Sequence, residues 1–159
     1  MSIEENKRRE IEALYIEHAE LISDDKIDGW PDLYAEDCSY KLISRVNHDR
    51  NLPLAVIFAE SRGALIDRAT AIRNTMVYSP KAITHVVSSI RVVEKLTPQL
   101  FSTRSVIAVY QTPGSGQTAL LLVGRSFDVV AFDGDKARFK ERRVIFDSEL
   151  LAGAIVYPV

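Results

Sequence analysis

The sequence predicts an α+β fold in which N-terminal helices pack in a strongly curved antiparallel sheet that forms a half-open cone. Helical periodicity lies before residue 75, whereas strand-like alternation fills nearly all of the chain after Pro80. One predicted strand, Thr118–Phe132, is far longer than the usual ~5–6 residues, so it has to bend. Gly124, near its middle, is a candidate for a bulge or kink. The 159 residues favour one domain, spanning 1–159.

Three helices are predicted. The first, Glu4–Ser23, carries apolar residues and His18 on one stripe at helical spacing. A short helix, Trp30–Tyr34, has Pro31 near its first position, where a missing N–H costs little. The third helix covers Arg62–Asn74 and again shows one apolar stripe.

Alternation of apolar and polar residues predicts five strands, and two glycine-containing turns, Pro113–Gly116 and Asp133–Gly134, connect the last three. The strands are Cys38–Val46, Ala82–Val93, Leu100–Thr112, Thr118–Phe132 and Ala137–Asp147. A polar loop, Asn47–Asn51, follows the first strand, and an apolar segment, Leu150–Val159, follows the last.

The charge balance and the cysteine count exclude several classes of function. With 20 basic and 22 acidic residues, the chain offers no electrostatic attraction to nucleic acid or to an anionic membrane. Its one cysteine, Cys38, excludes an internal disulfide framework, a zinc site built from cysteines and an iron–sulfur cluster held by this chain alone. The three histidines match no common metal motif. No segment has the pattern of a targeting signal or a membrane span, so we expect a cytoplasmic protein.

Two histidines are candidates for acid–base chemistry. His18 lies on the apolar stripe of the first helix, and His85 lies near the start of a strand, on a face expected to include Arg91. Either imidazole is a candidate general base in the cone, His85 with Asp37 or Asp67 as its carboxylate. The alternative is a hydrogen-bonded core histidine, which is the commoner role.

Arginine also occurs at an unusual place in the long strand. Arg125 falls in the series Leu121, Val123, Phe127 and Val129, which we expect to form the inner, apolar face. A buried arginine needs a partner, so it either binds an anionic ligand in the cone or forms a salt bridge within the chain or at a subunit interface.

Two further patterns concern the surface. Arg138, Lys140 and Arg142 alternate on one face of the last strand, which is typical of a solvated strand or of a surface for an acidic partner. The strand 118–132 is apolar on both sides, so both faces of the sheet need cover. Because no second helical layer is predicted, another subunit is the expected cover of the outer face.

Several segments together resemble a known family. They are Tyr34–Tyr40, Leu52–Ser61, Ile66–Arg68, Ile83–Val92, Phe146–Leu151 and Ile155–Val159. In combination they resemble the small (beta) subunits of Rieske-type aromatic-ring-hydroxylating oxygenases, in particular those acting on aromatic carboxylates, such as salicylate 5-hydroxylase and terephthalate dioxygenase. One position departs from the family pattern, which usually has Asn after the serine where this chain has Ser89 after Ser88.

The resemblance implies a nuclear-transport-factor-2-like cone and an α3β3 hexamer. In such a hexamer the large alpha subunit holds the [2Fe–2S] Rieske cluster, the mononuclear iron and the substrate, and the electrons come from NAD(P)H. This chain would then carry no cofactor, metal or catalytic residue, and would support assembly through contacts with the alpha subunit and within a beta trimer. Asp67, Arg68, His85, Arg91 and Arg125 would be structural or interfacial.

Two other functions are compatible with the residues themselves. One is a free-standing isomerase or dehydratase of the same fold that uses a His–carboxylate pair. The other is a small-molecule binding module with Arg125 as its anion anchor.

Overall fold

The computed structural model describes residues 3–74, 81–149, 151, 155 and 157–159, so part of the predicted apolar segment Leu150–Val159 lies outside the described residues. The elements follow the chain in this order: α1 (Glu5–Ser23), the 3-10 helix η1 (Ile27–Leu33), β1 (Tyr34–Ser44), α2 (Arg45–Asp49), β2 (Ile57–Ala59), α3 (Arg62–Asn74), β3 (Lys81–Thr97), β4 (Leu100–Pro113), β5 (Ala119–Asp133) and β6 (Lys136–Phe146).

The strands form one sheet in the order β2-β1-β6-β5-β4-β3. The long strands β3 to β6 pair antiparallel with their neighbours, as predicted, but β1 pairs with β6 in parallel. After β1 and β2 the chain crosses over through α3 before it enters β3. In the sheet, β1 lies beside the last strand, β6, and the two strands run in the same direction. The predicted α+β architecture is confirmed, with one parallel pair in the otherwise antiparallel sheet.

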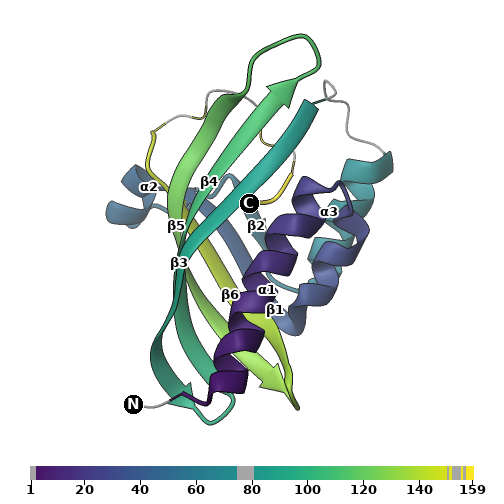
Figure 1. Ribbon diagram of the computed structural model, residues 1–159. Helices are drawn as coiled ribbons and strands as arrows, with labels where there is room; N and C mark the ends of the chain where they lie inside the picture. Colours follow the sequence, from purple (N-terminus) through teal and green to yellow (C-terminus); the bar gives the residue numbers. More distant parts are fainter. Residues whose placement is uncertain (1–2, 75–80, 150, 152–154, 156) are drawn as a thin grey trace.

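Helices cover the concave face of this bent sheet, as Figure 1 shows. The first helix, α1, packs along β3 and against β6, while α3 packs on η1 and β1. The short helix α2 contacts β1 and β6 near their ends and buries none of its residues. Among the described helices, none therefore lies across the convex face.

Three local differences from the predicted elements have simple physical causes. The helix α2 replaces the end of the predicted strand Cys38–Val46 and the start of the predicted loop Asn47–Asn51. It forms there because Ser44 Oγ accepts a hydrogen bond from the N–H of Asn47 at 3.2 Å and caps the helix. The second helix starts earlier, at Ile27, and is a 3-10 helix. The strand β2 was not predicted, because three residues are too few to show a period.

Bulges interrupt the long strands and bend the sheet. Single extra residues stand at Leu121 in β5 and at Lys140 in β6, and Ser89 and Ile90 together oppose Ser105 of β4. Gly124, predicted as a bulge or kink, instead marks a close approach, because a Cβ there would lie 2.3 Å from the Ile145 carbonyl oxygen.

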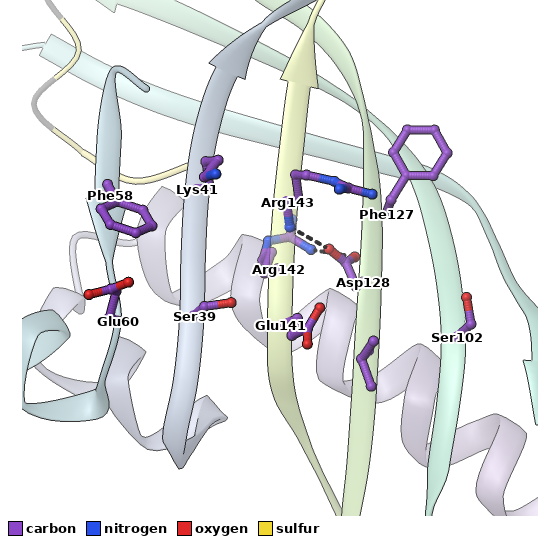
Figure 2. Close-up of a pocket in the computed structure, with 11 residues that line it drawn as sticks. Ser39, Lys41, Phe58, Glu60, Ser102, Phe127, Asp128, Glu141, Arg142 and Arg143 are labelled. Carbon is purple, nitrogen blue, oxygen red and sulfur yellow. Dashed lines mark hydrogen bonds and ion pairs between the residues drawn. The ribbon is translucent and has the colours of Figure 1, made fainter. Parts of the chain in front are cut away.

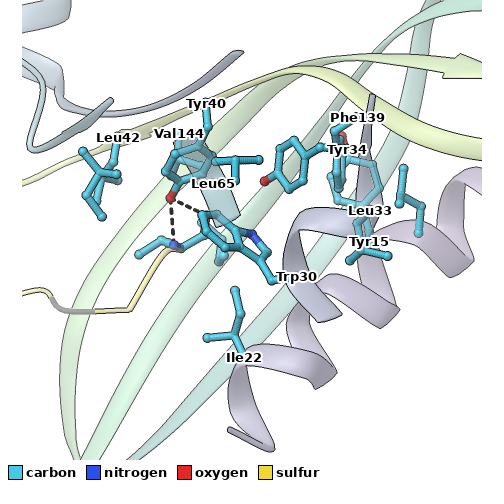
Figure 3. Packing of buried hydrophobic residues seen from close by; sticks show 14 of the residues in the cluster. Tyr15, Ile22, Trp30, Leu33, Tyr34, Tyr40, Leu42, Leu65, Phe139 and Val144 are labelled. Atoms are coloured by element: carbon cyan, nitrogen blue, oxygen red, sulfur yellow. Dashed lines mark hydrogen bonds between the residues drawn. The ribbon is translucent and has the colours of Figure 1, made fainter. Parts of the chain in front are cut away.

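Aromatic side chains fill the space between helices and sheet, as Figure 3 shows. Trp30, Tyr34, Tyr40 and Phe139 are fully buried. Trp30 meets Tyr34 and Tyr40 edge to face with ring centroids 5.8 and 5.7 Å apart, a geometry worth about 0.5–1.5 kcal/mol per pair beyond area burial. The cone is therefore packed with side chains of the chain itself.

Candidate functional site

A buried ion pair lies inside the cone between β5 and β6. Arg142 Nη1 lies 3.1 Å from Asp128 Oδ2, and the two side chains are 1% and 0% exposed. The Ser126 hydroxyl donates to the same oxygen at 2.7 Å, and the backbone N–H of Arg143 donates to Oδ1 at 3.2 Å. Tyr15 of α1 donates its hydroxyl hydrogen to Asp128 as well, so the network ties the helix to the sheet.

Burial raises the pKa of Asp128, and the opposing effects of Arg142 and of the donors around the carboxylate are smaller. The guanidinium of Arg142 also stacks over the ring of Phe139, 4.9 Å from its centroid. Removing one partner of such a pair leaves an uncompensated buried charge and costs about 3–5 kcal/mol. A hollow of about 500 Å³ on the outer side of the sheet includes Asp128 and Arg142 among its lining residues, while the ion pair and the hydrogen bonds of the two side chains are made within the chain itself.

His18 lies at the centre of the aromatic core. Its Nε2 accepts a hydrogen bond from the indole N–H of Trp30 at 3.1 Å and lies 3.0 Å from the Tyr34 hydroxyl. Because an indole nitrogen only donates, Nε2 is the acceptor and carries no hydrogen. Burial lowers the pKa of His18 well below its usual value, and the charge of Arg142 lowers it further. The imidazole is thus a neutral hydrogen-bonding partner within the core.

His85 lies where a short segment of chain enters the cone. The residues that pack over it are Tyr157, Pro158 and Val159. Val159 is held by Tyr40, whose hydroxyl donates a hydrogen bond to the Val159 carbonyl at 3.0 Å and accepts one from the Val159 N–H at 2.8 Å. The cavity left here is about 10 Å³, roughly the space of a single water. Burial lowers the pKa of His85 to about 4, Arg142 adds to the shift, and the nearby Pro158 carbonyl opposes it.

The structure does not bring His85 together with either candidate carboxylate. Asp37 is exposed on β1 and accepts a hydrogen bond from Lys140 at 2.6 Å, which lowers its pKa. Asp67 is exposed on α3, where its neighbour Arg68 is partly buried. A His–carboxylate pair is therefore not assembled from these residues.

Arg125 lies on the opposite face of the sheet from the one predicted. Beyond the bulge at Leu121, the buried residues of β5 alternate as Leu122, Gly124, Ser126, Asp128, Val130 and Phe132. Val123, Arg125 and Phe127 therefore point to the convex face. The Arg125 side chain is 52% exposed, and its Nη1 lies 3.6 Å from Asp147 Oδ1. The prediction was wrong because Ser126 and Asp128 look like outward residues by type, whereas the internal network satisfies them.

Arg91 is likewise on the convex face, not on the face of His85. His85 pairs with Val109 and is buried, but the bulge at Ser89 and Ile90 shifts the register so that Arg91 pairs with Arg104. One extra residue reverses the alternation of a strand, so the two side chains point to opposite sides.

The convex face carries two hollows that share Phe127. One, of about 500 Å³, runs from Phe58 past Lys41 and Arg143 to Phe127, as Figure 2 shows. The other, of about 360 Å³, lies over β3, β4 and β5. It is lined by Arg91, Arg104, Arg125 and Phe127 among others, and we call it the arginine groove. Phe58 and Phe127 are 55% and 39% exposed. The first hollow also has the carboxylates of Glu60 and Glu141 beside Lys41 and Arg143, whereas the named charged residues of the arginine groove are all cationic.

The sequence patterns missed Asp128 and Arg142. Arg142 was grouped with Arg138 and Lys140 as one basic face, but the Lys140 bulge separates them, and only Arg142 is buried. A signal for Asp128 does exist, because aspartate is rare inside a strand and needs a partner when the strand is buried.

No described residues gather into a group of three or more His, Cys, Asp or Glu side chains that would fit a metal ion. Cys38 is buried and free. Within the described ranges, no helix combines the length and apolar character needed to cross a bilayer.

Comparison with known proteins agrees with this architecture. The family described as "Ring hydroxylating beta subunit" matches residues 17–152. The small subunit of anthranilate 1,2-dioxygenase from Burkholderia cepacia is 27% identical over 91% of this chain and 88% of its own length. A beta subunit of terephthalate 1,2-dioxygenase from Comamonas sp. is 25% identical over 94% of this chain and 97% of its own length.

A solved structure agrees as well. The chain superimposes with a TM-score of 0.81 on a structure assigned as the beta subunit of an aromatic-ring-hydroxylating dioxygenase of Novosphingobium aromaticivorans, at 28% identity over 88% of each chain. The predicted resemblance and the nuclear-transport-factor-2-like cone are confirmed. With a family match over most of its length and a packed cone of the expected topology, the chain belongs to the family of ring-hydroxylating oxygenase beta subunits.

Proposed function

We propose that the chain is the non-catalytic beta subunit of a ring-hydroxylating oxygenase that acts on an aromatic carboxylate in the cytoplasm. In this proposal it joins a larger alpha subunit in an α3β3 hexamer and contributes to assembly through alpha–beta and beta–beta contacts. The observation that carries the proposal is the filled cone. His18, His85 and the Asp128–Arg142 pair are buried in contacts with the chain itself, and the cavity that the described residues line beside His85 is only about 10 Å³.

The proposed cofactors belong to the partner. A Rieske cluster takes two cysteines and two histidines, whereas the described part of this chain has one buried cysteine and no gathered ligand set. The residues present do not fit an iron site. We therefore assign the [2Fe–2S] cluster, the mononuclear iron and the entry of electrons from NAD(P)H to the alpha subunit.

The substrate class is proposed from the relatives named above. Their names specify anthranilate and terephthalate, and both compounds are aromatic carboxylates. The residue roles proposed for this chain are structural for Arg68 and His85 and interfacial for Asp67, Arg91 and Arg125. The exposure of the last three supports that division.

The test is co-expression of this chain with the Rieske-type large subunit of its oxygenase. We expect a co-purifying complex with the iron content and absorption spectrum of a Rieske protein and a mass corresponding to three copies of each subunit. Once electron-transfer proteins that oxidise NAD(P)H are added, the complex should hydroxylate anthranilate or terephthalate. A complex built with His85→Phe should keep its turnover number. An isolated chain that converts an aromatic substrate, and loses that activity in His85→Phe while staying folded, would instead establish a free-standing enzyme.

A further inference from the structure

The arginine groove gathers three cationic side chains from three neighbouring strands. Arg91 of β3 stands directly opposite Arg104 of β4, which in turn pairs with Phe127 of β5. Arg125 of β5 lines the same groove, and all three arginines are exposed. Three guanidinium groups therefore lie around one hollow of about 360 Å³.

Few carboxylates of the described chain lie within ion-pair distance of these arginines. Asp147 lies 3.6 Å from Arg125, but it also accepts hydrogen bonds from Arg45 and is shared between the two. Among the described residues, Arg91 and Arg104 form no ion pair within 4.0 Å. The groove keeps a net positive charge that the described chain leaves uncompensated.

The bulge in β3 places Arg91 opposite Arg104 on the convex face, and this arrangement lowers the stability of the sheet. Like charges directly opposite each other on a sheet destabilise it. Without the bulge at Ser89 and Ile90, counting along the register would put Arg91 opposite Thr103, on the concave face. Ser89 adopts a left-handed backbone with φ of 53°, an uncommon conformation for serine. A strained bulge that brings two arginines together is expected at a site where negatively charged groups of a partner offset the repulsion between their positive charges.

The surroundings of the groove resemble the buried centre of a protein interface rather than an ordinary charged surface. Phe127 at the groove is 39% exposed, and Val86 and Val123 on the same face are 48% and 36% exposed. Arginine and aromatic residues are enriched in interface cores, where most binding energy is concentrated. An exposed phenylalanine beside arginines fits a partner that brings both apolar surface and carboxylates.

We propose that the arginine groove is the docking site for an acidic segment of the large oxygenase subunit, whose carboxylates pair with Arg91 and Arg104 while its apolar side chains cover Phe127. This inference rests on the proposed function. In the proposed beta trimer a three-fold axis joins two different patches, so a second copy would cover the groove only by bringing a carboxylate-bearing patch of its own. Charge complementarity favours a carboxylate-bearing partner, which we assign to the large subunit, and a second copy is an outcome of the test.

The test uses the double charge reversal Arg91→Glu/Arg104→Glu in the full chain, mixed with the purified Rieske-type large subunit. We expect about 100-fold weaker association of the large subunit at low ionic strength, since the substitutions replace two attractive charges with two repulsive ones. Wild-type association should weaken steeply between about 50 and 300 mM salt, whereas the variant should depend on salt much less. The matched control, Arg9→Glu/Arg50→Glu, changes the same charge on exposed residues outside the groove and should bind like wild type.

A neutral variant separates docking from folding. Arg104→Gln removes the repulsion between Arg91 and Arg104, so it should raise the Tm of the isolated chain by about 1–3 °C. It should also lower the affinity of the chain for the large subunit about tenfold. A merely structural arginine would lower the Tm instead.

The outcomes distinguish this inference from the proposed function. Unchanged affinity of Arg91→Glu/Arg104→Glu for the large subunit would overturn the docking site and leave the proposed function standing, as would a variant that loses only self-association. A wild-type chain that binds no large subunit would overturn the proposed function itself.

Discussion

At the scale of single residues, this chain buries groups that a sequence pattern marks as reactive or solvated. His18, His85, Asp128 and Arg142 are all inside the cone. Each is neutral or charge-paired there, because an unpaired buried charge is far more costly than a satisfied one. The same groups make stability depend on pH and on single hydrogen bonds.

Acidification should destabilise the chain through His85. Its pKa in the folded chain is about 4, below the usual 6.5, so the unfolded chain binds the proton more readily between these values. The stabilisation is therefore fully present above about pH 7 and is lost as the pH falls towards 4, with a total of about 3 kcal/mol. Burial of His18 adds a change in the same direction.

Urea unfolding at several pH values between 7.5 and 4.5 measures this effect. The fall in unfolding free energy should be markedly smaller for His85→Phe, which cannot be protonated. His48→Gln is the control, because the His48 side chain is 40% exposed and meets water in both states. Equal pH dependence in wild type and His85→Phe would contradict the assignment.

Ser89 shows a residue-scale strain. Its φ of 53° is a conformation that glycine adopts freely and asparagine tolerates, and asparagine is the residue that the family pattern usually has here. Ser89→Gly should raise the unfolding free energy by about 1 kcal/mol, Ser89→Asn should raise it less, and Ser89→Val should lower it. Thermal or denaturant unfolding measures the series. Ser88→Gly, one residue earlier and without a positive φ, should be destabilising, and a gain there would argue against strain at Ser89.

At the scale of elements, bulges decide which side chains face each other. Beyond the Asp133–Gly134 turn, Ala131 pairs with Arg138 and Val130 with Phe139, and simple continuation would place Asp128 opposite Glu141. The extra residue Lys140 moves Arg142 into that place instead. One inserted residue thereby replaces a carboxylate–carboxylate clash with a buried ion pair.

Gly124 gives an element-scale prediction for the β5–β6 contact. A Cβ at this position would lie 2.3 Å from the Ile145 oxygen and 2.9 Å from the Phe146 Cα, both backbone atoms that move only if the strands separate. Gly124→Ala should therefore lower the unfolding free energy by about 3 kcal/mol, as overpacking does in a tight core. Gly114→Ala is the matched control, because a Cβ there meets nothing within 4 Å. Similar unfolding curves for the two variants would show that the strands yield easily.

At the scale of the whole molecule, one face of the sheet is filled and the other is open. Helices, aromatic rings and the segment 157–159 occupy the concave side, whereas the convex side exposes Phe127, Val123 and the arginine groove. Among the described residues, side chains of the chain itself fill the concave side, whereas the two hollows of about 500 and 360 Å³ lie on the convex side. This arrangement suits a subunit that supports a partner.

The segment 157–159 packs into the cone with Pro158 and Val159 buried, and the Tyr40 hydroxyl forms hydrogen bonds with Val159. Tyr40→Phe removes both hydrogen bonds to Val159, which should cost about 1–2 kcal/mol and open the segment locally. Hydrogen exchange should show faster exchange of the Val159 amide and of the amides near His85. Tyr157→Phe, which removes an exposed contact with Asp25, should have a smaller effect. Unchanged exchange in Tyr40→Phe would mean that packing alone holds the segment.

The sequence by itself determined the long elements and their order, but not the short α2 and β2. The long helices and strands were predicted with ends within a few residues of those observed, because periodicity and turn residues act locally. The resemblance of several segments identified the family. The tertiary structure alone decided the parallel β1–β6 pairing and the faces on which Arg91, Arg125 and Arg142 lie. Those faces depend on bulges and on partners distant in sequence, and a shift of one residue in register exchanges the two sides of a strand.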